Sequence, residues 1–208
     1  MDDYLKQTIL TYNDQADQYA KKTTKYTPAP ERDTFISLLP PKAKILEAGC
    51  GSRRDSAFFV SHGFSVVGFD LSNKLIEIAK KQVPQAAFHV MDLRNISVQE
   101  KFDGIWACAS LLHLKRDEFP AVLKRFHKLL TSGGILFLLM KEGKGEKIVN
   151  SASMANKPRF FTYVTKEEIN MLLTDAGFTV DRIVPWDQQD RQTERPSEMW
   201  LSCFARKV

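Results

Sequence analysis

ILEAGCGSRRD, residues 45–55, joins a short apolar strand, an acidic residue, a glycine turn and the start of a helix. Gly49 and Gly51 allow the chain to turn tightly and let a ligand lie against bare backbone. The helix that follows presents free N–H groups in its first turn. The stretch therefore predicts a ligand-binding turn, with an ordinary strand-to-helix turn as the alternative.

Two classes of cofactor bind at such a turn, and neighbouring residues distinguish them. The dinucleotide fingerprint requires a third glycine three residues after the second, and Arg54 occupies that position. Glu47, two residues before Gly49, is also foreign to that fingerprint. It suits a cofactor that carries an ammonium group and no phosphate. A nicotinamide-dependent oxidoreductase is therefore the less favoured class.

Strands and helices alternate after this turn. We expect strands at residues 45–48, 64–69, 87–91, 102–107 and 135–140, and helices at residues 54–62, 73–81 and 118–130. Ser72 and Asp117 are the expected N-caps of the second and third helices. The turn Ser132-Gly133-Gly134 leads into the last strand. This alternation indicates βαβ units and a mainly parallel sheet.

The C-terminal part has a different order of elements. A long polar connection, residues 141–157, is followed by Thr165 and Glu168, which form a capping box for a helix that ends at Gly177. Residues 178–184 and 199–206 are expected strands with only a polar loop between them, so they should pair antiparallel. The predicted fold class is α/β: a Rossmann-like three-layer sandwich with a mostly parallel seven-stranded sheet and a C-terminal antiparallel hairpin.

An apolar stripe near the N-terminus predicts an amphipathic helix. Its members, spaced by four and three residues, are Leu5, Ile9, Tyr12, Ala16 and Tyr19. The basic KKTTKY run and the prolines after it end this helix, and a short helix at residues 32–39 follows. We expect a single domain over residues 1–208, with a helical cap at 1–42 and the core at 43–208.

Two aspartates follow strands at the same edge of the predicted sheet. Asp70 ends the second strand, where a carboxylate can accept hydrogen bonds from both hydroxyls of a ribose. Asp92 ends the third strand, where its side chain and the Leu93 N–H can read the amino edge of an adenine. Each alone is also a common cap or turn residue. Together with the glycine turn, they predict a nucleoside site at the carboxyl ends of the strands.

The composition excludes several other classes of protein. Of the 208 residues, 43% are hydrophobic and 26% are charged, which are globular values. No apolar run reaches the length of about 20 residues that a membrane helix needs, and MDDYLKQTIL lacks a signal-peptide pattern. Three widely spaced cysteines predict reduced thiols in the cytoplasm rather than disulfides or zinc, and no metal is expected. The net charge of +5 is scattered, which argues against nucleic-acid binding.

The chain resembles the class I S-adenosylmethionine-dependent methyltransferases, in the bacterial branch related to the tellurite-resistance and type-11 methyltransferases. The resemblance covers nearly the whole chain and rests on the segments YNDQADQYA, ILEAGCGSRRD, GFSVVGFDLSNKLIEIAKK, VMDL, FDGIWACASLLHL, LLTSGGILFLLMKEG, RFFTYVTKEEINMLLTDAGF and WLSCFARK. It implies S-adenosylmethionine as cofactor and methyl transfer as the activity. It does not specify the methyl acceptor.

The resemblance also implies a cofactor-binding set. Its members are Tyr19, Glu47, Ala48, Gly49, Cys50, Gly51, Asp70, Leu71, Met91, Asp92, Leu93, Ala107 and Ser110. The glycines would pass beneath the methionine part, Glu47 would lie near its amino group, and residues 107–110 would flank the reactive methyl. The family usually has a third glycine two residues after the second, where this sequence has Arg53.

His113 is the one histidine expected near the methyl group, and it is either a catalytic base or a packed histidine. Tyr12 and Tyr19 either touch the methionine end of the cofactor or pack on the core. The sequence predicts a small-molecule acceptor, no nucleic-acid or membrane partner, and a monomer or homodimer. A non-catalytic S-adenosylmethionine-binding or regulatory protein is the alternative function.

Overall fold

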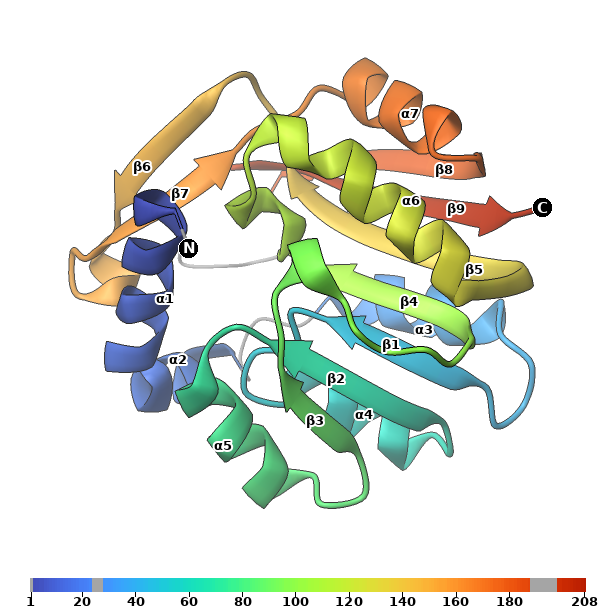
Figure 1. Cartoon of the computed structure of the whole chain (residues 1–208), viewed down its shortest axis with the longest axis horizontal. Helices are drawn as coiled ribbons and strands as arrows, with labels where there is room; N and C mark the ends of the chain where they lie inside the picture. Colours follow the sequence, from blue (N-terminus) through green and yellow to red (C-terminus); the bar gives the residue numbers. More distant parts are fainter. Residues whose placement is uncertain (1, 24–27, 188–197) are drawn as a thin grey trace.

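The computed structural model describes residues 2–23, 28–187 and 198–208. Seven strands form its central sheet: β1 (Lys44–Ala48), β2 (Ser65–Asp70), β3 (Ala87–Val90), β4 (Phe102–Cys108), β5 (Leu130–Lys141), β8 (Phe178–Asp187) and β9 (Met199–Lys207). Their order is β3-β2-β1-β4-β5-β9-β8 (Figure 1). The first five strands are parallel, whereas β9 is antiparallel to both β5 and β8. The predicted mostly parallel sheet with a C-terminal antiparallel hairpin is therefore confirmed.

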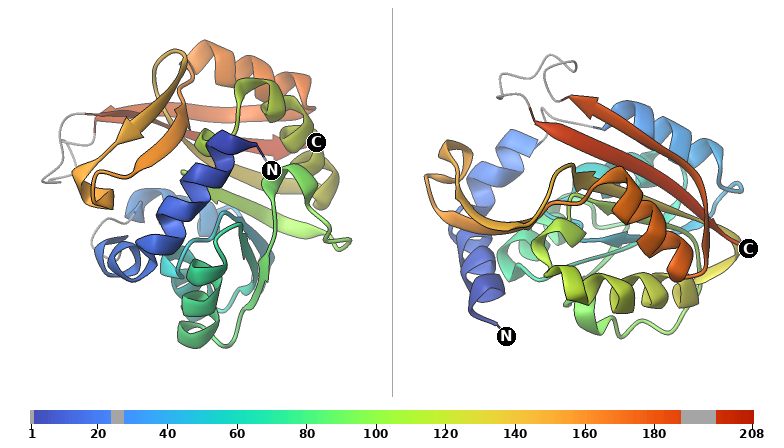
Figure 2. Two further views of the ribbon diagram at one scale, coloured as in Figure 1. Left: turned by 60° about the vertical axis from the view of Figure 1, so that its left-hand side comes forward. Right: turned by 90° about the horizontal axis from the view of Figure 1, so that it is seen from above.

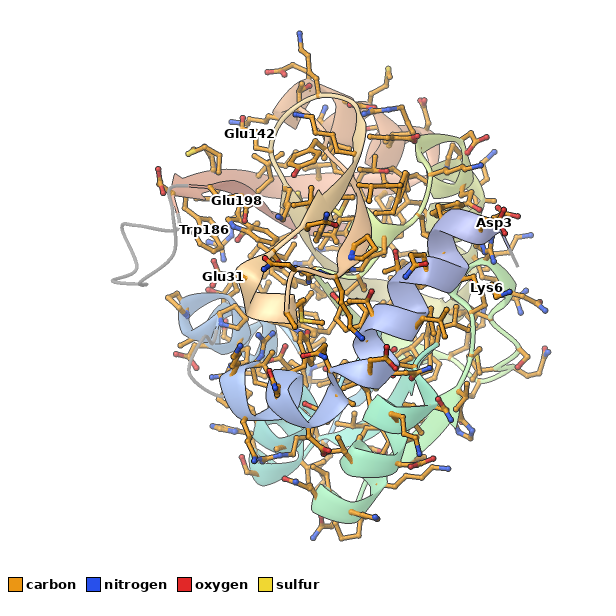
Figure 3. All side chains as sticks on the ribbon, turned by 90° about the vertical axis from the view of Figure 1, so that its left-hand side faces the viewer. Asp3, Lys6, Glu31, Glu142, Trp186 and Glu198 are labelled. Carbon is orange, nitrogen blue, oxygen red and sulfur yellow. The ribbon has the colours of Figure 1, made fainter. Side chains whose placement is uncertain are left out.

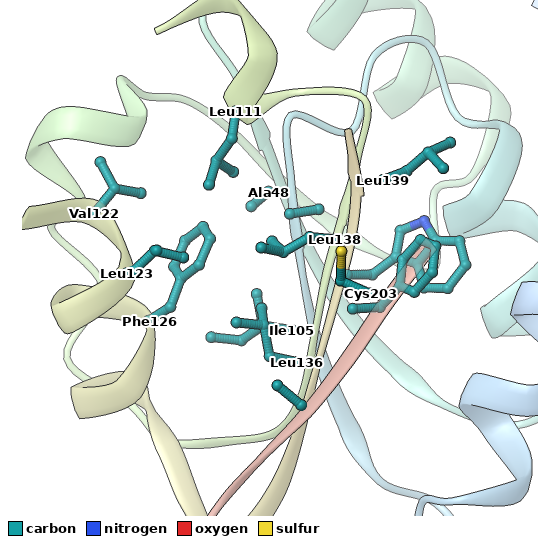
Figure 4. Packing of buried hydrophobic residues seen from close by; sticks show 14 of the residues in the cluster. Ala48, Ile105, Leu111, Val122, Leu123, Phe126, Leu136, Leu138, Leu139 and Cys203 are labelled. Atoms are coloured by element: carbon teal, nitrogen blue, oxygen red, sulfur yellow. The ribbon is translucent and has the colours of Figure 1, made fainter. Parts of the chain in front are cut away.

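Helices cover both faces of this sheet. The larger helices of the core are α3 (Ala29–Ser37), α4 (Arg54–Ser61), α5 (Asn73–Gln82), α6 (Phe119–Leu129) and α7 (Lys166–Asp175). On one face, Phe35 of α3 and Phe59 of α4 contact Trp106 of β4, and α5 packs beside α4. On the other face, Leu123 and Phe126 of α6 pack on the strands (Figure 4). Helix α7 lies on that same face, beside α6 (Figure 1).

Two of the three predicted helix caps are correct. The Ser72 hydroxyl accepts a hydrogen bond from the Leu75 N–H, and the Thr165 hydroxyl accepts one from the Glu168 N–H, both at 3.2 Å. The prediction for Asp117 is wrong, because a short 3₁₀ turn, η3 (Arg116–Glu118), precedes α6. There the Lys115 N–H donates to the Glu118 carboxylate at 2.7 Å.

The predicted connection at residues 141–157 contains regular structure. Strands β6 (Glu146–Asn150) and β7 (Pro158–Thr162) form a separate antiparallel hairpin around a 3₁₀ turn, η4 (Ala152–Met154). The prediction missed β6 because its side chains are mostly exposed, with Ile148 at 66%, so the strand carries no apolar alternation. The predicted loop between the last two strands falls at residues 188–197, outside the described residues.

The first predicted helix is broken in two. The structure has α1 (Asp3–Asp14) and α2 (Ala16–Thr23), separated at Gln15, whose φ of −107° and ψ of 12° lie outside the helical range. Helix α1 packs on both β7 and α5, and α2 packs on α5. In α1 the buried side chains include Thr8 and Thr11, which hydrogen-bond to the β7 backbone at 3.0 and 2.8 Å. Helix α1 therefore lies beside the hairpin, as both views of Figure 2 show. No helix among the described residues is both long and apolar enough to span a membrane.

The next helix begins earlier than predicted. It runs over Ala29–Ser37 instead of residues 32–39, and Pro30 lies in its first turn. Proline is tolerated there because the first N–H groups of a helix have no partner within the helix.

Arg53 adopts a backbone conformation that favours glycine. It precedes α4 with φ 139° and ψ −13°. Its side chain lines an outer cavity, together with Asp17, Lys21 and Lys81, and does not line the cavity formed by the glycine turn. The side chain that replaces the family's third glycine therefore points away from that turn.

We expect Arg53→Gly to stabilise the fold by about 1 kcal/mol, because strain on the order of 1–3 kcal/mol exceeds the entropic cost of glycine, roughly 0.5–1 kcal/mol. Thermal unfolding should show a rise in Tm of about 2–4 °C. Arg53→Ala is the matched control, since it removes the side chain but keeps the Cβ. An equal rise in both variants would contradict backbone strain as the cause.

Candidate active site

One cavity lies at the carboxyl ends of β1, β2 and β4, beneath the N-terminal helices. Its walls are formed by Leu5, Thr8, Ile9, Tyr12, Tyr19, Gly49, Gly51, Phe69, Asp70, Leu71, Leu75, Met91, Asp92, Leu93, Cys108, Ala109, Ser110, His113 and Leu114. The empty space measures about 650 Å³, including the part open to solvent. Helix α1 crosses this side of the molecule, with Asp3 and Lys6 projecting outward near its start (Figure 3).

The glycine turn forms the floor of this cavity. Gly49 and Gly51 have φ values of 77° and 56°, which favour glycine. The N–H groups of Gly49 and Cys50 both donate to the Phe69 carbonyl, at 2.8 and 2.9 Å. A Cβ added to Gly49 would lie 2.3 Å from the Ser110 Cβ. The turn is therefore held against β2 and pressed against the segment that follows β4.

Asp70 joins this turn to the start of α5. Its carboxylate accepts hydrogen bonds from the N–H groups of Gly51 and Ser72, both at 2.9 Å. Burial raises the pKa of Asp70, while these backbone hydrogen bonds act in the opposite direction. Each carboxylate oxygen has a further lone pair, so Asp70 can accept additional hydrogen bonds at the cavity wall.

Asp92 lies at the next strand end, between Met91 and Leu93 of the same wall. The Arg94 guanidinium contacts its carboxylate at 2.7 Å and also reaches Glu118 at 3.1 Å and Asp2 at 3.4 Å. The Asp92 charge is therefore paired, and its carboxylate is fixed in place at the cavity wall.

Four residues of the predicted cofactor-binding set do not line the cavity: Glu47, Ala48, Cys50 and Ala107. Glu47 is buried behind the turn, where it accepts a hydrogen bond from the Ser56 hydroxyl. Burial, followed by the nearby charge of Asp55, raises the pKa of Glu47 well above its usual range. Contact between Glu47 and a cofactor remains a prediction.

A buried polar cluster behind the turn was not predicted. The Arg54 guanidinium donates to both oxygens of Asp55, at 2.9 and 2.6 Å, and to the Cys108 sulfur at 3.2 Å. The Trp106 indole donates to Asp55 at 2.9 Å. Arg54 therefore fixes the start of α4 to the end of β4. In the sequence, only the charged triplet RRD, residues 53–55, points to this cluster.

His113 belongs to a chain of hydrogen bonds in the cavity roof. Its Nδ1 lies 2.7 Å from the Phe160 carbonyl, which can only accept, so Nδ1 carries the hydrogen. Its Nε2 then accepts from the Tyr12 hydroxyl at 2.9 Å, and Tyr12 accepts from Arg159 at 3.1 Å. Burial, assisted by the charge of Arg159, lowers the pKa of His113 to about 3. His113 is therefore neutral with both ring nitrogens engaged.

The walls of this cavity fit the implied cofactor. The Ser110 hydroxyl is buried and has no hydrogen-bond partner, as expected of a group that meets a ligand. Gly49 contributes bare backbone to the cavity, and Asp70 and Asp92 contribute carboxylates that can accept hydrogen bonds. Among the described residues, no group of three or more His, Cys, Asp or Glu side chains could hold a metal. The three cysteines are free thiols.

Comparisons with known proteins agree with this geometry. Residues 45–134 match the family model described as a methyltransferase domain. The chain is 28% identical to a malonyl-[acyl-carrier protein] O-methyltransferase of Hamiltonella defensa, over 64% of this chain and 52% of that protein. It thus spans about half the length of that relative.

Two solved structures share the fold. One is the 1,6-didemethyltoxoflavin-N1-methyltransferase of Burkholderia thailandensis, with TM-score 0.73 and 23% identity over 96% of this chain and 88% of that chain. The other is a TehB-like S-adenosylmethionine-dependent methyltransferase of Corynebacterium glutamicum, with TM-score 0.70 and 21% identity over 93% and 98%. The domain match, the relatives and the fold agree with the resemblance in sequence. Residues 45–134 of this chain therefore match a methyltransferase domain, and the chain has the fold of S-adenosylmethionine-dependent methyltransferases.

Proposed function

We propose that this chain transfers a methyl group from S-adenosylmethionine to a small-molecule acceptor. The observation that carries the proposal is a single cavity whose wall includes Asp70, Asp92, Tyr12 and His113. When bound, the cofactor would supply a methyl group on a sulfonium: an in-line nucleophile would bond to the methyl carbon, and the sulfur would leave with the electron pair of the broken carbon–sulfur bond. Alignment and exclusion of water are then the main tasks of the protein.

The proposed cofactor contacts follow the strand ends. Asp70 accepts hydrogen bonds from the ribose hydroxyls, and Asp92 with the Leu93 N–H binds the adenine. The methionine part lies on Gly49 and Gly51, with Tyr19 above it. A Cβ on Gly51 would approach the Tyr19 ring to 3.4 Å, so the ring lies directly beside the turn, and both line the same cavity, which supports contact of both with the same part of the ligand.

A small acceptor agrees with the cavity and with the names of the relatives. The roof consists of α1 and the segment after β4, and the β6–β7 hairpin packs on α1. The structural relative from Burkholderia thailandensis is named for 1,6-didemethyltoxoflavin, a small molecule. We also propose that residues 1–208 act as one domain with residues 1–42 as its cap, as a monomer or homodimer. The free thiols support a cytoplasmic location.

We propose that His113 orients Tyr12 and does not act as a base. A general base is most effective when its pKa lies near the working pH, and His113 titrates at about 3. Its Nε2 lone pair is already used by the Tyr12 hydroxyl. The acceptor should then be a soft nucleophile that needs no protein base.

Asp70→Ala should lower the affinity for S-adenosylhomocysteine by at least about a hundredfold, because two hydrogen bonds to a charged acceptor, at roughly 1.5–3 kcal/mol each, are lost. Isothermal titration calorimetry measures this change. Ser72→Ala is the matched control, since it removes the cap of α5 at a cost of about 1 kcal/mol in stability while the carboxylate remains. If a folded Asp70→Ala protein binds S-adenosylhomocysteine as tightly as wild type, Asp70 has only a structural role.

At matched saturation with both substrates, His113→Ala should leave the rate of methyl transfer to a small thiol within about threefold of wild type between pH 6 and 8, because His113 supplies no base. Loss of a general base would cost about a hundredfold or more. The measurement is the initial rate with methyl-labelled S-adenosylmethionine over a panel of thiols, with the exposed His62→Ala as control. A hundredfold loss would identify His113 as the base. Failure of wild type to transfer any label, despite binding the cofactor product, would favour the non-catalytic alternative.

A further inference from the structure

Arg159 is a cation without an acidic partner beside the cavity roof. It lies on β7, where its guanidinium donates to the Tyr12 hydroxyl at 3.1 Å and to the Ser151 hydroxyl at 3.0 Å. Its Nε is buried and has no hydrogen-bond partner. Among the described residues no carboxylate pairs with it, whereas Arg94, Arg116 and Lys141 each have one. Arg159 is half-buried, and its guanidinium lies over the rings of Tyr12 and Phe161 without a counter-ion, an arrangement in which an anionic ligand would supply the missing charge.

The hydrogen bonds of Arg159 lead directly to the cavity wall. Arg159 donates to Tyr12, and Tyr12 donates to His113, so every link runs away from the guanidinium. Such a chain polarises its members and makes the Tyr12 hydroxyl a stronger donor, so an oxyanion can accept its one hydrogen in place of the His113 Nε2. Tyr12 and His113 both line the cavity, but Arg159 does not. After burial, the charge of Arg159 is the largest cause of the lowered pKa of His113, so this charge acts at the wall.

The charges around the cavity are not all paired in the same way. Asp70 and Asp92 lie at the strand ends, and Arg94 already pairs with Asp92. Tyr12, another residue of the wall, is hydrogen-bonded to Arg159, for which the described residues supply no carboxylate.

We propose that the methyl acceptor carries an anionic group, such as a carboxylate or another oxyanion, that binds at the Tyr12–His113 wall, and that Arg159 selects it by acting through Tyr12. Arg159 is thus a positioning residue that determines specificity. This inference rests on the proposed methyl transfer and extends it to the class of acceptor.

The experiment uses labelled S-adenosylmethionine and a small-molecule extract of the source cells, separated on an anion exchanger at pH 7 before the reaction. Wild type should transfer label with the retained, anionic fraction and not with the flow-through. For each variant we measure the amount of the anionic fraction that gives half of the maximal rate. In Arg159→Gln this amount should rise about tenfold to a hundredfold, which is the effect of losing one charge-assisted contact. The affinity for S-adenosylhomocysteine should stay within about threefold.

Three further variants distinguish a role of Arg159 in acceptor selection from a purely structural role. Arg159→Lys keeps the charge and should retain much of the anionic preference. Tyr12→Phe removes the hydroxyl through which Arg159 acts, so it should raise the half-maximal amount as Arg159→Gln does. It therefore provides the same test if Arg159→Gln folds poorly. Lys147→Gln removes one exposed cation from the same hairpin and should leave the half-maximal amount unchanged.

Two results would overturn the inference. Acceptor activity in the flow-through would exclude an anionic acceptor. An equal loss of S-adenosylhomocysteine affinity in Arg159→Gln would assign Arg159 to the cofactor's own carboxylate. Absence of transfer in every fraction by a wild-type protein that binds S-adenosylhomocysteine would instead contradict the proposed function, and the inference with it.

Discussion

The contact between Gly49 and Ser110 is the constraint on which the site depends. A Cβ at Gly49 would overlap the Ser110 side chain at 2.3 Å, and the φ of 77° independently favours glycine. The same turn donates two hydrogen bonds to the Phe69 carbonyl and one to Asp70. The ends of β1, β2 and β4 are thereby fixed to one another, and the cavity is the space that they leave beneath α1. Open α/β sheets bind ligands at this edge because the loops diverge there.

Polar contacts attach the cap to this edge. Thr8 and Thr11 on the buried face of α1 bond to the β7 backbone, and Tyr4 donates to Glu118 at 2.6 Å. Glu118 belongs to the Arg94 cluster that also holds Asp92. The first helix, the hairpin and the wall of the cavity therefore form one hydrogen-bonded unit. A side chain on any of the three affects the geometry of the other two.

The sequence predicted those features that depend on local backbone chemistry. The glycine turn, the strand-end aspartates and the caps Ser72 and Thr165 each follow from neighbouring residues, and the structure brings Gly49, Gly51, Asp70 and Asp92 to one cavity. The mainly parallel sheet followed from the alternation of strands and helices, and the antiparallel hairpin from the lack of a helix between the last two strands. The ligand contacts of these residues remain predictions.

The features that sequence reasoning missed depend on distant pairs or on exposed strands. Tyr12 meets His113 across 101 positions, and Arg159 meets Tyr12 across 147, so no local pattern could show their hydrogen bonds. Strand β6 lacks a buried face and hence the alternation that would identify it. The break between α1 and α2 lies at the backbone of Gln15, and the apolar spacing continues across it.

The central claim is that one cavity holds the nucleoside on Asp70 and Asp92 and presents the sulfur to the wall of Tyr12, Ser110 and His113. A crystal structure of the complex with S-adenosylhomocysteine tests it most directly. The account predicts both ribose hydroxyls within hydrogen-bond distance of the Asp70 carboxylate and the sulfur facing that wall. A ligand whose ribose lies away from Asp70, or whose sulfur points away from Tyr12 and His113, would contradict it.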